Sequence, residues 1–198
     1  VSGLHIPLES IIDPETQKTF QQLAQEHRVQ LHNLRLSNQT LQVGNGLKRK
    51  GKRLLTVGTD CSSGKMFTSL HLDKALNQLG YQSTFVATGQ CGILVSGSGI
   101  AIDAVGADFI SGAVEYLSPE SDSLQIIEGQ GSLFHPAYAG VSLGLIHGAQ
   151  PDYLIMCHDI GRINLKNFSY PTPNLELCIE LNLQMASLTN PTCKLLGI

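Results

Sequence analysis

The sequence predicts an α/β fold, a three-layer sandwich built on a mostly parallel sheet. From Leu54 onward, short apolar runs alternate with stretches of helical periodicity. One run, 153–157, is apolar throughout, which is typical of a strand that helices bury on both faces. A loop bounded by Gly58 and Gly64 joins the first run to the first helical stretch and ends in Gly64-Lys65, the layout of a phosphate-binding P-loop. We therefore expect a P-loop NTPase-like arrangement.

The order of the apolar and helical patterns gives the individual elements. The first helix ends before Gly80, a residue type that commonly follows a helix C-terminus. Ligands of parallel sheets collect at the carboxyl ends of the strands, so the residues after each strand are the first candidates for a site. The predicted strands are 54–57, 83–88, 123–128, 153–157 and 194–198, and the predicted helices are 66–79, 100–116, 141–148 and 174–187.

The residues before the first strand have the pattern of the end of another unit. Asp13-Pro14 predicts a helix start, with aspartate as N-cap and proline at the first helical position. Residues 29–36 alternate apolar with polar side chains, as a half-buried strand does. Residues 37–52 have the composition of a linker. The basic run 48–53 is either a solvated part of this linker or a phosphate-facing patch beside the P-loop.

Composition argues against several classes of function. The 198 residues carry a net charge of -3 with a pI near 6.1, which disfavours nucleic acid and membrane surfaces as partners and favours a small-molecule substrate. The five cysteines form no CxxC pair, so we expect reduced thiols in a cytoplasmic protein. We also expect the protein to form a homo-oligomer. The chain opens on Val1 and closes on a predicted strand, which indicates a piece of a longer protein.

The P-loop is expected to bind an anion. Backbone N–H groups point into such a loop, the helix N-terminus adds a partial positive charge, and Lys65 adds a full one. Five residues separate the two glycines, and Met66 stands where Ser or Thr normally ligates Mg²⁺, so magnesium is not expected to be held in the usual way. The predicted cofactor-binding residues are Gly58, Thr59, Asp60, Cys61, Ser62, Ser63, Gly64, Lys65 and Met66.

Two residues have both a chemical and a structural interpretation. Cys61 lies near a helix N-terminus and Lys65, a setting that lowers the pKa of a thiol, but no histidine is paired with it locally. Asp103 is either a metal ligand or a carboxylate that favours the start of a helix. We predict no metal site at Cys61 or Asp103.

Polar residues follow the second and third predicted strands. Gln90 follows the second strand within a glycine-rich stretch and is predicted to bind substrate. Glu128 ends the third strand, where P-loop proteins hold a carboxylate that reaches Mg²⁺ or its water. We predict three catalytic residues here: Glu128 or His135 as the base, and Gln130 as a hydrogen-bond donor.

A second polar cluster follows the fourth strand. His158 and Arg162 are predicted to bind substrate, because a guanidinium can clamp a carboxylate or phosphate with two parallel hydrogen bonds.

Two of these motifs resemble known families. The loop 58–65 and Glu128-Gly129-Gln130-Gly131 are similar to segments of dethiobiotin synthetase and its relatives, which share the long glycine spacing. A closer resemblance covers the whole chain and is to the D-glutamate N-acetyltransferase-like family. Ser62-Ser63 replaces the more usual Ala-Val of that family, and Phe67 replaces a small polar residue. The segments that carry the resemblance are the loop with Met66 and Thr68, then 88–90, 99–105, 128–132, 135–138 and 144–148.

This resemblance implies a Rossmann-like N-terminal domain, of which 1–45 would be the end, followed by a P-loop domain over 46–198. It also implies transfer of an acetyl group from acetyl-CoA to the amine of a D-amino acid such as D-glutamate. The phosphates of CoA are anions that a P-loop can cradle without a metal. Two alternatives stay open: an ATP-dependent ligase or kinase of the dethiobiotin synthetase type, which Met66 disfavours, and a nucleotide-binding regulatory domain without turnover, which the polar strand ends disfavour.

Overall fold

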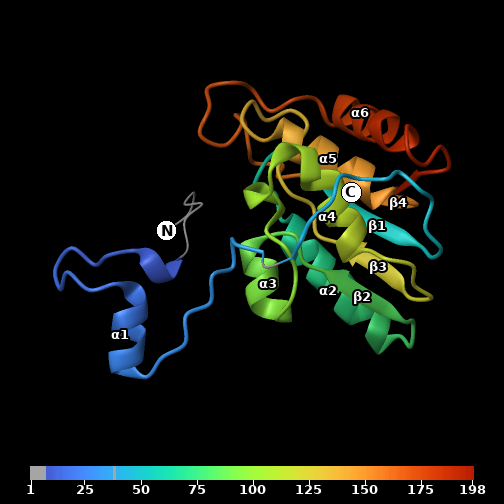
Figure 1. Cartoon of the computed structure of the whole chain (residues 1–198). Helices are drawn as coiled ribbons and strands as arrows, with labels where there is room; N and C mark the ends of the chain where they lie inside the picture. The colour runs from blue at the N-terminus through green and yellow to red at the C-terminus, as the bar shows by residue number, and fades with distance from the viewer. Residues whose placement is uncertain (1–7, 38) are drawn as a thin grey trace.

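A computed structural model describes residues 8–37 and 39–198 (Figure 1). Its sheet has five strands in the order β2-β3-β1-β4-β5, and every neighbouring pair is parallel. The predicted α/β class is confirmed, and each predicted strand is present with small shifts at its ends. The strands are β1 (Arg53–Gly58), β2 (Ser83–Val86), β3 (Leu124–Ile127), β4 (Tyr153–Cys157) and β5 (Lys194–Gly197).

The central strand β1 shows how the sheet is covered. Leu55 and Val57 pack into the main apolar core together with residues of α4 (Ile110–Leu117), α5 (Ala139–Ala149) and α6 (Leu175–Ser187). Thr56 points to the other face, because side chains alternate along a strand. There its hydroxyl lies 2.9 Å from that of Ser69 in α2 (Lys65–Gln78). Helices α4 to α6 therefore cover one face and α2 the other, which gives three layers.

The connection between β2 and β3 differs from the prediction. The glycine-rich stretch contains a short helix, α3 (Gln90–Ser96), that ends at Gly97 with a positive φ of 78°. The expected single helix over 100–116 is wrong: two single-turn helices, η2 (Ile102–Ala104) and η3 (Ala107–Phe109), precede α4. Val105 and Gly106 between these turns have extended ψ angles of 140° and 141°, which interrupts any continuous helix.

The N-terminal segment carries η1 (Leu8–Ser10) and α1 (Phe20–His27), which lie apart from the sheet and its helices in Figure 1. The predicted helix start at Asp13-Pro14 is wrong. Thr19 is the N-cap of α1 and forms a capping box with Gln22. The Asp13 carboxylate instead accepts hydrogen bonds from Thr16 within a turn.

Residues 29–36 form no strand, which is a second correction within the described chain. Val29 is exposed, so its alternation with polar residues does not reflect a buried face. The end of the segment nevertheless contacts the α/β body. Leu34 packs beside β2 and α3, and the Arg35 guanidinium pairs with Asp103 at 2.7 Å.

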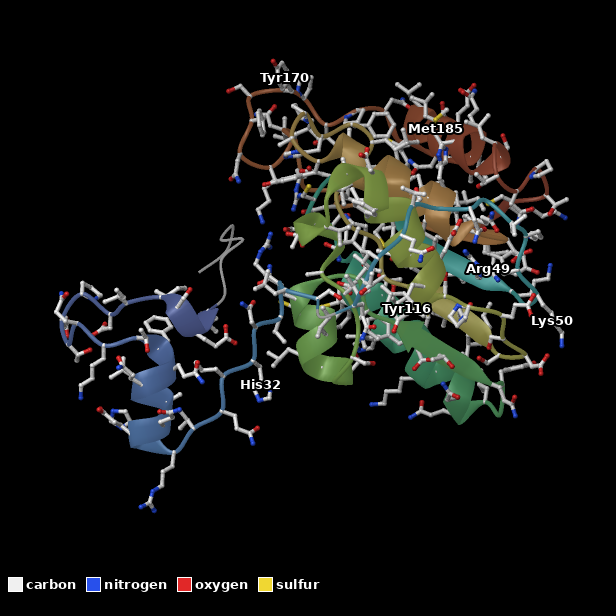
Figure 2. The ribbon with its side chains drawn as sticks, in the orientation of Figure 1. His32, Arg49, Lys50, Tyr116, Tyr170 and Met185 are labelled. Carbon is white, nitrogen blue, oxygen red and sulfur yellow. The ribbon has the colours of Figure 1, made fainter. Side chains whose placement is uncertain are left out.

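The basic run lies at the amino ends of the strands, because Arg53 begins β1 and the P-loop follows its other end. Lys50 pairs with Asp122 at 2.7 Å and Lys52 with Asp152 at 2.9 Å. In Figure 2 Arg49 and Lys50 lie near the start of β1, far from Tyr170. The interpretation of this run as a phosphate-facing patch is therefore wrong, and its ion pairs secure the linker to the sheet. Among the described residues, no helix is both long enough and apolar enough to cross a membrane.

Candidate functional site

The P-loop connects β1 to α2 at the carboxyl edge of the sheet. Gly58 allows the loop to fold back on itself, since a Cβ there would lie 2.5 Å from Ser63 Oγ. Gly64 has a φ of 98° and leads into α2 from the left-handed region that favours glycine. Lys65 is buried, and its Nζ donates to the Asp60 carbonyl at 2.7 Å and to Ser63 Oγ at 3.3 Å. Burial lowers the pKa of Lys65.

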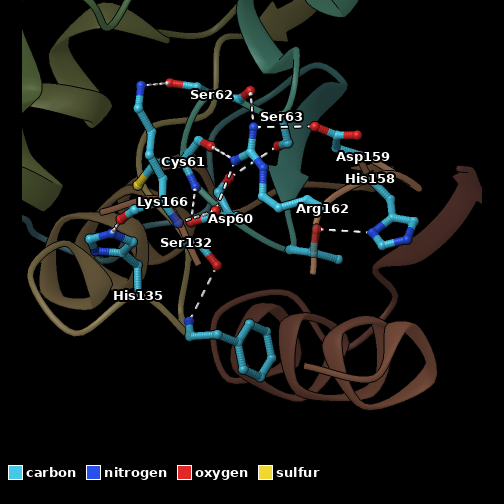
Figure 3. A network of polar contacts seen from close by, with 12 residues as sticks. Asp60, Cys61, Ser62, Ser63, Ser132, His135, His158, Asp159, Arg162 and Lys166 are labelled. Atoms are coloured by element: carbon cyan, nitrogen blue, oxygen red, sulfur yellow. Dashed lines mark hydrogen bonds and ion pairs between the residues drawn. The ribbon is translucent and has the colours of Figure 1, made fainter. Parts of the chain in front are cut away.

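A segment between β4 and α6, which we call the strap (residues 158–174), holds the P-loop from outside (Figure 3). Arg162 Nη1 donates to Asp60 Oδ2 at 2.8 Å, and the guanidinium also donates to two loop carbonyls. The backbone N–H of Lys166 donates to the same Asp60 oxygen at 2.7 Å, and its Nζ donates to Ser62 Oγ at 2.6 Å. The strap therefore fixes the outer side of the loop.

These contacts change the role assigned to Arg162 and His158. The prediction that Arg162 clamps a substrate anion does not fit, because Asp60 and the loop carbonyls already occupy its guanidinium. His158 Nδ1 lies 3.1 Å from the Thr59 hydroxyl. Neither Arg162 nor His158 lines the cavity described below. We reassign both as residues that position the loop.

Asp60 is fully buried, yet it is held as a carboxylate. Burial alone would raise its pKa. The hydrogen bond from Arg162 and the backbone N–H groups of Lys166 and Cys61 outweigh this effect, so the pKa of Asp60 lies below its ordinary value. A charged Asp60 is thus the anchor to which the strap attaches.

Glu128 directly follows β3 and is almost fully buried. Its Oε2 accepts hydrogen bonds from the backbone N–H groups of Thr88 and Gly89, both at 3.0 Å. The absence of a side chain at Gly92 is needed for this arrangement, since a Cβ there would lie only 2.2 Å from Oε2. Burial raises the pKa of Glu128 in spite of these hydrogen bonds. The carboxylate is therefore a stronger base than an exposed glutamate.

His135 is buried, and both of its ring nitrogens are occupied. Nδ1 accepts a hydrogen bond from the backbone N–H of Ala137 at 3.2 Å, which leaves the proton on Nε2, 3.1 Å from the Lys166 carbonyl. The ring stacks on Tyr138 and meets the edge of Phe168. A base needs a free lone pair, so we correct the predicted catalytic role of His135 to one of positioning the strap.

A cavity of about 760 Å³ lies between the P-loop and the residues that follow β2 and β3, a size typical of small-molecule sites. It brings together Lys65 and Met66 of the P-loop with Gln90, Glu128 and Gln130, which follow β2 and β3 at the same edge of the sheet. Gln130 Nε2 donates to the Thr88 hydroxyl at 3.3 Å. His135, predicted as a catalytic residue, also lines this cavity. The other residues that line it are Cys61, Ser62, Gly64, Phe67, Gly89, Cys91, Asp103, Gly129, Gly131, Tyr138, Val141, Lys166 and Asn167.

Sequence reasoning missed Lys166, which lines this cavity from the strap. The only signal was a lysine in the polar segment after the fourth strand, four residues beyond Arg162. It also missed that Asp103 lines the cavity while its carboxylate pairs with Arg35 of the N-terminal segment.

Asp60, Cys61 and His135 present possible metal-ligand atoms within 4.8 Å of one another. Arg162 and a backbone N–H already use the Asp60 oxygen Oδ2, and both His135 nitrogens are hydrogen-bonded. Burial raises the pKa of the Cys61 thiol despite the nearby Lys65, so the expectation of a lowered thiol pKa is wrong. These donors fit a hydrogen-bonded cluster better than a metal site.

A parallel sheet whose central strand leads through a glycine-bounded, lysine-ending loop into a helix defines a P-loop domain of the α/β class. The chain belongs to the family described as "Domain of unknown function (DUF1611_C) P-loop domain", which matches residues 42–198.

Known proteins extend this similarity beyond the P-loop domain. The chain is 52% identical to a D-glutamate N-acetyltransferase of Pseudoalteromonas sp over 201 residues, covering 100% of this chain and 59% of the relative. A D-glutamate N-acetyltransferase of Tritonibacter scottomollicae is 47% identical over 171 residues, with 85% and 51% coverage. A DUF1611 family protein from Anabaena variabilis has a crystal structure that matches with a TM-score of 0.81 at 37% identity, over 99% of this chain and 57% of that one. The resemblance inferred from the motifs is confirmed, and the chain spans a little over half the length of these proteins.

Proposed function

We propose that this chain is the coenzyme A-binding part of an N-acetyltransferase that acylates the amine of a D-amino acid such as D-glutamate. One observation carries the proposal: a single cavity is lined by both the P-loop lysine, Lys65, and a buried carboxylate, Glu128. The names of the two curated relatives support the same activity. Acetyl transfer needs both features, an anion site for the acyl donor and a base for the acceptor.

The P-loop side suits the phosphates of CoA. Backbone N–H groups and Lys65 favour an anion, whereas Met66 offers no hydroxyl to ligate a magnesium ion. CoA carries a pyrophosphate and a 3′-phosphate, and either fits a loop that relies on N–H groups and ammonium charge. This distinguishes the proposal from an ATP-dependent ligase or kinase, which requires a centre for Mg-ATP.

Glu128 suits the acceptor. An amino acid amine is an ammonium ion at neutral pH and must lose a proton before it attacks. In this proposal Glu128 takes the proton, which is supported by its raised pKa and by its position in the lining of the same cavity as the P-loop. The amine nitrogen then forms a bond to the thioester carbonyl carbon and the C–S bond breaks. The nitrogen loses a second proton as it becomes an amide, and this proton passes to the sulfur, so CoA leaves as a thiol. Gln130 or a loop N–H donates a hydrogen bond to the carbonyl oxygen as negative charge develops there.

Calorimetric titration of the intact chain with CoA, acetyl-CoA, ATP and Mg-ATP tests the proposal. We expect CoA and acetyl-CoA to bind, and thiol release from acetyl-CoA to depend on D-glutamate rather than L-glutamate. Tight binding of Mg-ATP with no response to CoA would favour the ligase or kinase alternative. Nucleotide binding without any turnover would favour a regulatory domain.

A further inference from the structure

We propose that Lys166 is a second phosphate-binding cation of the P-loop, which supplies the positive charge that a magnesium ion supplies in P-loop proteins with a hydroxyl after the lysine. The proposal rests on the proposed function only in requiring that a pyrophosphate-bearing ligand enters the cavity. It goes beyond that function by naming a recognition residue on the strap and by making binding independent of a divalent cation.

The backbone of Lys166 is held from both sides. Its N–H donates to Asp60 Oδ2 at 2.7 Å, and its carbonyl lies 3.1 Å from Nε2 of His135. Asp60 and His135 are 0% and 2% exposed, and Arg162 further fixes Asp60. Two buried polar side chains are thus committed to one exposed residue. Such backbone contacts restrict where the Lys166 side chain can reach, as a binding residue requires.

The side chain extends from this clamp to the mouth of the P-loop. Its Nζ lies 2.6 Å from Ser62 Oγ, and both residues line the cavity (Figure 3). Lys65 Nζ is buried and donates to the Asp60 carbonyl and to Ser63 Oγ, whereas Lys166 Nζ donates to Ser62 Oγ, so the two ammonium groups contact different residues of the same loop. An anion bound by the loop N–H groups can therefore meet both. A pyrophosphate carries charge on two phosphorus centres and offers each ammonium group a phosphoryl group of its own, which a single phosphate does not.

The other nearby cation does not compete for this role. Arg162 donates to Asp60 and to the carbonyls of Cys61 and Ser62, so its guanidinium faces the protein. Lys166 Nζ has only a serine hydroxyl as its described partner, which is a neutral acceptor that an anion readily replaces. Asp60 and His135 take no part in the proposed chemistry. Their role in this proposal is to hold the backbone of Lys166.

The test measures binding of inorganic pyrophosphate by calorimetry to the intact chain in EDTA. We expect Lys166→Met to weaken binding about ten- to a hundredfold, in line with a lost hydrogen bond between charged groups. Lys166→Arg keeps the charge and is expected to retain most of the affinity. The matched control is Lys74→Met, which removes an exposed lysine of α2 outside the cavity and should bind like the wild type. Excess Mg²⁺ should not increase the wild-type affinity.

Three results would overturn the inference. Wild-type affinity for pyrophosphate in Lys166→Met, together with lost binding in Lys65→Met, would place the site in the P-loop but exclude Lys166, leaving the proposed function intact. Equal losses in Lys166→Met and Lys74→Met would show only a general effect of surface charge. Failure of the wild type to bind either pyrophosphate or CoA would overturn both this inference and the proposed function.

Discussion

Arg162 and Asp60 form an ion pair that closes the P-loop from outside, with Nη1 and Oδ2 2.8 Å apart although the residues are 102 positions apart in sequence. The Asp60 side chain is 1% exposed and that of Arg162 is 19% exposed. The two residues follow β1 and β4, which are neighbours in the sheet. The strand order therefore sets the contact that shapes the loop.

Replacing Arg162 by Gln should destabilise the protein by about 2 kcal/mol at neutral pH, because the buried Asp60 charge loses its main partner. The pKa of Asp60 is depressed, so its contribution to stability is present above the ordinary value of 3.8 and is lost as pH falls through the lower, folded value. The loss of stability below that pH should accordingly be shallower in Arg162→Gln than in the wild type. Urea denaturation across this range checks both effects. A variant with wild-type stability at neutral pH would show that the pair contributes little.

Glu128→Gln should lower the rate of acetyl transfer by about 10²- to 10⁴-fold, the usual contribution of a general base. The pKa of Glu128 is raised, so its protonated form favours the folded state and stability is lost as pH rises from 4.5 through the folded value. Glutamine keeps an acceptor for Thr88 and Gly89 without the charge, and we expect Glu128→Gln to melt at or above the wild-type temperature at neutral pH. Thiol release and thermal melting measure the two effects. A fully active variant would remove Glu128 from the mechanism.

Gly92→Ala should displace the Glu128 carboxylate, since the new Cβ would lie 2.2 Å from Oε2. We expect a clear loss of both stability and activity. Gly140→Ala is the matched control, because Gly140 lies in α5 and a Cβ there meets nothing within 4 Å. That change should be neutral or stabilise by about 0.5–1 kcal/mol. Equal behaviour of the two variants in urea denaturation would contradict the packing argument.

His135→Gln should raise the KM for acetyl-CoA and leave the shape of the pH–rate profile unchanged, because His135 positions the strap and has no free nitrogen. A stability loss of about 1–3 kcal/mol is also expected from the buried hydrogen bonds. His27→Gln, an exposed change in α1, is the control for handling and folding. Loss of one limb of the pH–rate profile in His135→Gln alone would restore His135 as a base.

The sequence allows the sheet and the residues at its carboxyl edge to be predicted, but not the orientation of the side chains. Apolar runs such as 153–157 and the loop ending at Lys65 are local signals. The strand-end rule predicts that Glu128 and Gln130 lie at the same edge of the sheet as that loop, and they line one cavity with Lys65. The sequence predicts that Arg162 binds substrate, because residue type does not show which way a guanidinium points. That direction depends on Asp60, a contact between distant segments.

The predictions for two segments outside the sheet are wrong for a different reason. At 29–36 the alternation of apolar and polar residues matched a strand, but no neighbouring strand pairs with it in the described chain. At 100–116 the helical pattern was correct for its last part only, because the extended backbone at Val105 and Gly106 is not visible in the periodicity.

The strand order also has a consequence for synthesis on the ribosome. The P-loop is translated before both neighbours of β1, which are β3 and β4, and the strap that holds the loop comes later than β3 and β4. Every strand pair is parallel, so none forms by a local hairpin. The loop must therefore wait for about a hundred further residues before Arg162 and Lys166 can reach it. In the nascent chain, the P-loop gains its contacts with the strap only after most of the sheet has emerged.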